Sequence, residues 1–187
     1  MQQEIEKTLN ILQSGGIILY PTDTIWGIGC DATNEIAVQK IYNLKRRQES
    51  KSMLVLVHND FQLEQIIPEV PDTAWDIIDW SKKPTTLVLD NPQNIASNLI
   101  ADDHSLGIRI TQDSFCKRLI QQLKAPLVST SANISGEKSP KMFNEISTDI
   151  LQGVDYIVNL RQNETVQQKS STVIKLKNNG EVKVLRQ

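Results

Sequence analysis

The chain has 187 residues, close to the length of one typical domain, so a large second module has no room. Hydrophobic residues make up 39% of it, enough for a buried core, which excludes a disordered chain. The 20 basic and 22 acidic residues give a net charge of −2, which argues against binding nucleic acid through bulk positive charge. We therefore expect one domain over residues 1–187 that binds any polyanion locally.

Cysteine and histidine are few and scattered. Cys30 and Cys116 form no Cys-x-x-Cys pair, and His58 and His104 have no partner at zinc-ligand spacing, so we predict no metal site. The N-terminus lacks the pattern of a signal peptide, and no run approaches the roughly 18 apolar residues of a membrane span. These features are typical of a reduced, cytoplasmic protein without membrane contact.

Apolar spacing predicts helices and strands that alternate along the chain. In chain order the expected elements are a helix over 5–12, strands over 17–20 and 25–28, a helix over 36–44, a strand over 53–57, a helix over 75–80, strands over 86–89 and 106–110, a helix over 115–123, a strand over 127–128, a helix over 142–151, and strands over 156–160, 172–176 and 182–185. This alternation indicates an α/β domain, and the closely spaced strands at both ends favour a mixed sheet.

Three cations follow the helix expected over 36–44. Lys45, Arg47 and Lys51 share one face only if that helix has ended and the chain runs extended. In that geometry they converge and suit a triphosphate, with arginine as a fork and the lysines as point charges. The alternative is that they only complement the helix macrodipole.

Two polar segments are further candidates for ligand binding. In the turn-rich stretch 129–140, Ser131 and Asn133 fall on one face if the chain is extended, where they suit a ligand that brings its own negative charge. In the turn at 21–24, Thr22 and Thr24 present hydroxyls on one side. The alternative for both segments is an ordinary turn that satisfies its own backbone.

His58 follows the strand expected over 53–57, where ligands of α/β folds collect, although a solvated histidine at a strand end is equally compatible. Two nucleotide fingerprints fit less well. Residues 136–139 lack the contiguous Gly-Lys-Ser/Thr of a Walker loop. Residues 27–32 match G-x-G-x-x-A, but the glycines lie in the apolar run rather than opening a helix.

Five motifs, taken in order and spacing, resemble the YrdC/TsaC family: PTDTIWGIG (21–29), KRRQESKSM (45–53), GIRI (107–110), STSAN (129–133) and STVI (171–174). The resemblance covers nearly the whole chain. It implies a YrdC-like α/β fold, a twisted, mostly mixed sheet flanked by helices with a concave basic cavity. Because longer members carry an extra C-terminal domain, it also implies the single-domain form.

This resemblance implies an L-threonylcarbamoyladenylate synthase, a nucleotidyltransferase acting on L-threonine, bicarbonate and ATP. It would form threonylcarbamoyl-AMP and pyrophosphate for threonylcarbamoyladenosine modification of tRNA. ATP is then a substrate, and Mg2+ is carried by the nucleotide. An RNA-binding module and a carbamoyl-transfer component without synthase activity are the alternatives. Direct binding of tRNA and of partner proteins from the tRNA-modification pathway stays open.

The resemblance also implies site residues. The family's K-x-R-x-x-x-K element falls on Lys45, Arg47 and Lys51, which it assigns to catalysis and ATP binding, and its S-x-N element falls on Ser131 and Asn133. The other implied residues are Ser139 and Arg186 for ATP, and Thr22, Thr24, His58, Arg109 and Ser171 for threonine.

Overall fold

The computed structural model describes residues 1–48, 53–165 and 169–187. The helices are α1 (Gln2–Gln13), α2 (Glu35–Lys45), α3 (Asp60–Ile66), α4 (Asp72–Trp80), α5 (Ser114–Leu123) and α6 (Thr148–Gly153), with short 3₁₀ turns η1 (Ser97–Leu99) and η2 (Phe143–Glu145). The strands are β1 (Ile18–Tyr20), β2 (Gly27–Gly29), β3 (Leu54–Val57), β4 (Thr85–Asp90), β5 (Ser105–Ile110), β6 (Leu127–Ser131), β7 (Tyr156–Ile157), β8 (Thr172–Leu176) and β9 (Val182–Arg186).

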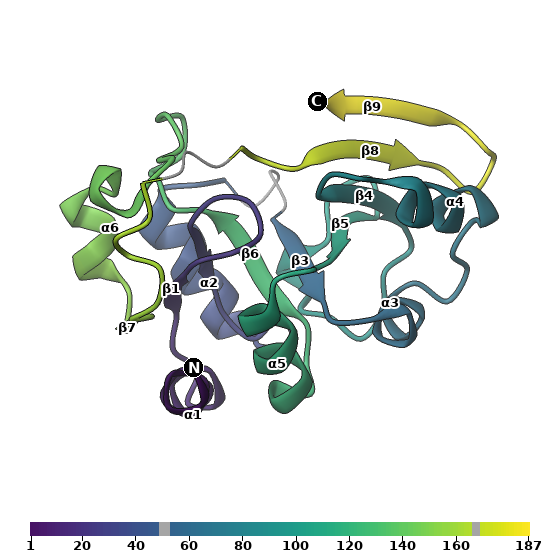
Figure 1. Ribbon diagram of the computed structural model, residues 1–187. Coiled ribbons are helices and arrows are strands. Elements are labelled where there is room, and N and C mark those ends of the chain that lie inside the picture. The colour runs from purple at the N-terminus through teal and green to yellow at the C-terminus, as the bar shows by residue number, and fades with distance from the viewer. Residues whose placement is uncertain (49–52, 166–168) are drawn as a thin grey trace.

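The described strands form one mixed sheet in the order β7-β1-β2-β6-β3-β5-β4-β8-β9. The pairs β1–β7, β3–β5 and β4–β8 are parallel, whereas the other neighbouring strands are antiparallel. The predicted α/β fold with a mixed sheet is therefore confirmed. Figure 1 shows β8 and β9 extending along the side of the molecule opposite α1. None of the described helices combines the length and apolar character that a membrane-spanning segment needs.

Several stretches differ from their predicted structure. The strand expected over 156–160 is β7 over Tyr156–Ile157 only, and the strand expected over 25–28 is β2 over Gly27–Gly29. The helix expected over 142–151 is interrupted, because Ile146 and Ser147 are extended and separate η2 from α6. The helix α3 was not predicted. Its N-cap Asn59 accepts a hydrogen bond from the amide of Gln62 at 2.9 Å, but the helix is only 7 residues long and offers little periodicity.

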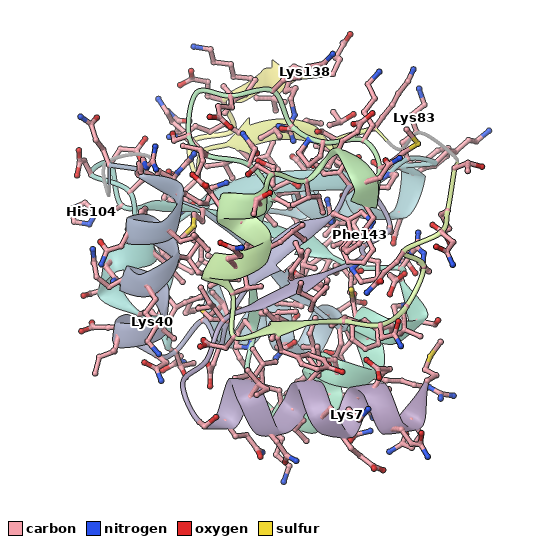
Figure 2. The ribbon with its side chains drawn as sticks, turned by 90° about the vertical axis from the view of Figure 1, so that its left-hand side faces the viewer. Lys7, Lys40, Lys83, His104, Lys138 and Phe143 are labelled. Atoms are coloured by element: carbon pink, nitrogen blue, oxygen red, sulfur yellow. The ribbon has the colours of Figure 1, made fainter. Side chains whose placement is uncertain are left out.

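Alternate residues of the central strands face different layers. On β3, Val55 and Val57 pack into the larger core with residues of α2, α3 and α4. Leu56 points the other way, into a second core with residues of α1 and α5. Figure 1 shows these two helices together on one side of the sheet, and Figure 2 shows α1 crossing the foot of the molecule with Lys7 projecting from it. Leu54 lies on the same face of the sheet as Leu56, but it lines a cavity there.

Candidate functional site

A cavity of about 280 Å³ lies on this face of the sheet. Alternate strand residues that point away from the larger core form its floor: Gly27, Leu54, Thr86, Val88, Gly107, Arg109, Ser129, Ser131 and Val173. Gly107 has no side chain to occupy the cavity. A Cβ atom at this position would lie only 3.2 Å from the Cβ of Leu54, which is a crowded contact. The cavity is therefore a hollow built largely on strand residues, with polar and apolar side chains side by side in its lining.

Arginines from three distant parts of the chain line the cavity, namely Arg47, Arg109 and Arg186. The lining residues that the structure describes include no carboxylate. Burial lowers the pKa of Arg47, and burial together with the charge of Arg109 lowers the pKa of Arg186. A guanidinium nevertheless keeps its proton at neutral pH, so the lining is cationic and suits an anion.

Arg47 reaches the cavity because α2 ends abruptly. Arg46 adopts the left-handed conformation with φ of 50°, and the amide of Arg47 donates to the carbonyl of Tyr42 at 2.9 Å. This cap redirects the chain directly after Lys45. The expectation that Lys45 and Arg47 share one cavity-facing surface is therefore corrected, while Lys51 lies outside the described residues.

Lys45 holds the loop after β6 from behind. Its side chain is buried, and its ammonium donates to the carbonyl of Ser131 and, at 2.6 Å, to that of Asn133. Its own carbonyl accepts from the amide of Ser135 at 2.8 Å. Burial, assisted by the charge of Arg47, lowers the pKa of Lys45 to about 7. Its predicted contact with ATP stays a prediction.

Ser131 and Asn133 differ in where they lie. Ser131 lines the cavity, as does Ser139 at the far end of the same loop. The amide nitrogen of Asn133 instead donates to the carbonyls of Ile134 at 2.9 Å and Glu137 at 2.8 Å, within its own turn. Only its buried Oδ1 has no partner among the described residues. Figure 2 shows Lys138, between Glu137 and Ser139, at the same end of the molecule as the C-terminal strands.

The turn at 21–24 divides its two hydroxyls between structure and cavity. Thr24 lines the cavity, whereas buried Thr22 organises the turn. The Thr22 hydroxyl donates to the carbonyl of Ile25 at 2.8 Å and accepts from the amide of Thr24 at 3.0 Å. It also lies 2.9 Å from the Thr24 hydroxyl, so Thr22 sets the position of Thr24.

Arg109 is fixed by Asp23, an acid in the turn at 21–24 that the sequence analysis did not single out. Its Nη2 donates to Oδ1 of Asp23 at 2.9 Å, and the other carboxylate oxygen accepts from the amide of Gln112 at 3.2 Å. The Nε of Arg109 is buried and has no partner among the described residues. The pair joins β5 to the turn at 21–24 and compensates the charge of Arg109.

Ser171 joins the strands at the far wall of the cavity. Its hydroxyl lies 2.9 Å from that of Thr86, and Arg186 donates through Nε to its carbonyl at 3.0 Å and through Nη2 to its hydroxyl at 3.2 Å. Sequence reasoning missed Thr86. The alternation of Thr86 with buried Leu87 places them on opposite faces, but it does not reveal that one face is hollow.

His58 is not among the residues that line the cavity. Its ring Nδ1 lies 2.8 Å from Oε1 of Gln62, which also accepts the backbone amide of His58 at 3.0 Å. Because an amide oxygen only accepts, this network assigns the ring proton to Nδ1 and leaves Nε2 as an acceptor. Its predicted role in binding threonine stays a prediction.

Trp26 forms part of the cavity wall and is only 6% exposed. Its ring packs against that of Phe143 with centroids 4.9 Å apart and planes tilted by 52°. Phe143 comes from η2, the short turn just before α6 (Figure 2). This contact supports the wall from the side of the loop that follows β6.

Comparison with known proteins identifies the family of the chain. Residues 10–187 match the model of the Sua5/YciO/YrdC family, whose description reads "Telomere recombination". The chain belongs to this family. The family resemblance found in the sequence motifs is therefore confirmed.

Among its relatives, the threonylcarbamoyl-AMP synthase of Idiomarina loihiensis is 33% identical over 76% of this chain and 78% of its own length. A Methanocaldococcus jannaschii protein, whose name assigns it that activity provisionally, is 36% identical over 94% of this chain and 83% of its own length. A variant of P. abyssi Sua5 superposes with a TM-score of 0.89 at 26% identity over 100% of this chain, which spans 56% of that chain. E. coli YciO superposes with a TM-score of 0.86 at 22% identity over 100% of this chain and 90% of that chain, and shows the fold alone.

Proposed function

We propose that this chain is a threonylcarbamoyl-AMP synthase, which forms threonylcarbamoyl-AMP and pyrophosphate from L-threonine, bicarbonate and ATP. The observation that carries the proposal is the cavity lined by Arg47, Arg109 and Arg186, with no carboxylate among its described lining residues. Such a cavity suits a substrate that brings several negative charges. Relatives that are 31–36% identical and bear the name of this activity support the same assignment.

The reaction needs no nucleophile from the protein. Bicarbonate takes up a proton and loses water to give carbon dioxide. The amine of threonine adds to this carbon dioxide and releases a proton, which gives a carbamate. A carbamate oxygen then forms a bond to the α-phosphorus of ATP while the bond from that phosphorus to the bridging oxygen breaks. Pyrophosphate leaves, so the step is a nucleotidyl transfer. The protein contributes by positioning the two reactants and neutralising phosphate charge.

The lining residues divide into two groups by this proposal. Arg47, Ser131, Ser139 and Arg186 hold the phosphates, and Thr24, Arg109 and Ser171 hold threonine. The loops that carry these contacts are fixed by Lys45, Thr22 and Asn133, which therefore act indirectly. In this proposal Lys51 joins the phosphate-binding group, and His58 joins the threonine-binding group.

The described lining offers no carboxylate to hold a cation, so we propose that Mg2+ is carried by the nucleotide's own phosphates. The product would serve threonylcarbamoyladenosine modification of tRNA in the cytoplasm. Direct contact with tRNA or with proteins of that pathway is not required for the synthase reaction itself.

A pyrophosphate-release assay with each substrate omitted in turn tests the proposal. Release is expected to need threonine, bicarbonate and ATP together and to yield an AMP-linked product by mass spectrometry. Serine should react more slowly, because a pocket that packs the methyl group of threonine loses about 1 to 3 kcal/mol without it. Equal release without any amino acid would refute the synthase. RNA binding without any pyrophosphate release would instead favour an RNA-binding module.

A further inference from the structure

Arg161 holds the turn at 21–24 without lining the cavity. Its Nη1 donates to the carbonyl of Thr22 at 3.0 Å and to Oδ2 of Asp113 at 2.9 Å, while its Nε donates to Oε1 of Glu164 at 2.8 Å. One planar guanidinium therefore connects the turn, the start of α5 and the segment that follows β7.

Asp113 gives this connection a rigid anchor. Its Oδ1 caps α5 by accepting the amide of Cys116 at 2.9 Å, so its Oδ2 is fixed where it meets Arg161. Helix α5 in turn packs on the sheet through buried Phe115 and Leu119. The backbone of Arg161 has φ of 59°, in the left-handed region that residues other than glycine adopt only where surrounding contacts hold them.

The hydrogen bond between Arg161 and Thr22 is linked to the cavity through the turn at 21–24. Arg161 is absent from the lining of the large cavity. With Thr22 it lines a neighbouring hollow of only about 10 Å³, too small for an organic ligand, whose lining residues Thr24, Ile25 and Trp26 also line the large cavity. From the carbonyl of Thr22 the chain of contacts runs through the Thr22 hydroxyl to that of Thr24, 2.9 Å away, which lines the large cavity.

We propose that Arg161 is a positioning residue that sets the threonine end of the cavity through the backbone of Thr22. This inference rests on the proposed function for its substrate. The phosphate end has a different support, because the loop carrying Ser131 is held by Lys45. Loss of Arg161 therefore affects the use of threonine much more than the use of ATP.

The kinetic test compares Arg161→Ala and Arg161→Lys with the matched control Glu164→Gln, which leaves the contacts with Thr22 and Asp113 in place. For Arg161→Ala we expect the KM for threonine to rise about tenfold, as for one lost charge-assisted hydrogen bond, with the KM for ATP within about twofold of wild type. Arg161→Lys should recover part of the loss, because a lysine reaches one acceptor without the fork. Glu164→Gln should behave as wild type.

Amide hydrogen exchange tests the same contact without any reaction. The amide of Thr24 donates to the Thr22 hydroxyl, so Arg161→Ala should speed its exchange, with no comparable change at Ile28 on β2. If the alanine variant does not fold, Arg161→Lys serves in both measurements. Unchanged exchange at Thr24 overturns the proposal, as does an equal rise in both KM values. Faster exchange in a protein that never releases pyrophosphate would keep the positioning role and refute the proposed function instead.

Discussion

Cations hold both of the loops that bring hydroxyls to the cavity, but the two loops are held in different ways. The turn at 21–24 is held by Arg109 and Arg161, each of which also contacts a carboxylate. The loop at 131–133 is held by Lys45, whose hydrogen-bond acceptors in the described structure are backbone carbonyls. The arginines that hold the turn at 21–24 therefore form ion pairs, whereas the buried ammonium that holds the loop at 131–133 is stabilised by the dipoles of backbone carbonyls.

This difference has an electrostatic consequence. The guanidinium of an arginine side chain generally keeps its charge around neutral pH. Among the residues that the structure describes, no carboxylate forms an ion pair with the buried ammonium of Lys45, and its pKa is lowered to about 7. The support of the loop at 131–133 should therefore respond to pH near neutrality, whereas that of the turn at 21–24 should not.

A cation that faces the cavity should matter more for activity than one that supports a loop. Arg47→Ala removes a charge-assisted contact to phosphate worth about 2 to 3 kcal/mol, so ATP-dependent pyrophosphate release should fall roughly 30- to 150-fold. Arg47→Lys should recover only part of this, because it keeps the charge and loses the fork. Steady-state kinetics on both variants measure the effect.

The neighbouring Arg46 provides the control. It is exposed and forms a surface ion pair with Asp149 at 3.3 Å, so Arg46→Ala should leave turnover within about twofold of wild type. Unchanged turnover in Arg47→Ala would mean that Arg47 only complements the macrodipole at the end of α2 and does not bind phosphate.

Removing Lys45 should reduce stability as well as activity. Lys45→Met leaves the buried carbonyls of Ser131 and Asn133 without their donor, and we expect a loss of about 2 kcal/mol in the free energy of unfolding. Urea denaturation at pH 9, where the native amine is neutral, measures this loss. The matched control is Lys40→Met, since Lys40 also donates to a backbone carbonyl, that of Gly15, but is exposed. Equal losses in both variants would contradict the supporting role of Lys45.

The pH dependence of stability tests the buried charge itself. The pKa of Lys45 falls from 10.5 to about 7 on folding, so between these values the unfolded chain binds more protons than the folded one. Stability should therefore rise as the pH increases from about 7 toward 10. In Lys45→Met this part of the rise should disappear. Parallel curves of unfolding free energy against pH for the two proteins would refute the lowered pKa.

The smallest effects should separate Ser131 from Asn133. Ser131→Ala removes a hydroxyl from the cavity and should raise the KM for ATP with little change in melting temperature. Asn133→Ala removes hydrogen bonds within the turn and should cost up to about 1 kcal/mol of stability. Melting curves and ATP titrations on both variants decide the matter. Wild-type affinity for ATP in Ser131→Ala would leave the loop with a structural role only.

Local patterns predicted most of the fold. The strand expected over 172–176 is β8 itself, and the helix expected over 115–123 differs from α5 by one residue at its start. Such elements carry a clear period and a cap, which are properties of neighbouring residues. The helix expected over 142–151 is wrong in its middle, because apolar spacing alone did not register the extended residues there.

The site was predictable only in part, because its geometry depends on contacts between distant residues. The motifs contained Arg47 and Arg109, the family resemblance also implied Arg186, and all three line the cavity. Nothing in the local sequence shows that Lys45 turns away from it, since that depends on carbonyls 86 and 88 residues further along the chain. The contact of Arg161 with Thr22 spans 139 residues and leaves no periodic signal.

The packing of Trp26 has a practical consequence for spectroscopy. Its indole is 6% exposed and lines the cavity, whereas Trp80 at the end of α4 is 83% exposed. Caesium, a cationic quencher that the arginine-lined cavity repels, should quench the emission of exposed Trp80 and spare that of Trp26. The half-buried Trp75 of α4 also emits, so in a Trp75→Phe variant the residual fluorescence reports occupancy of the cavity, and titrations can follow nucleotide and amino acid one at a time, before any turnover takes place.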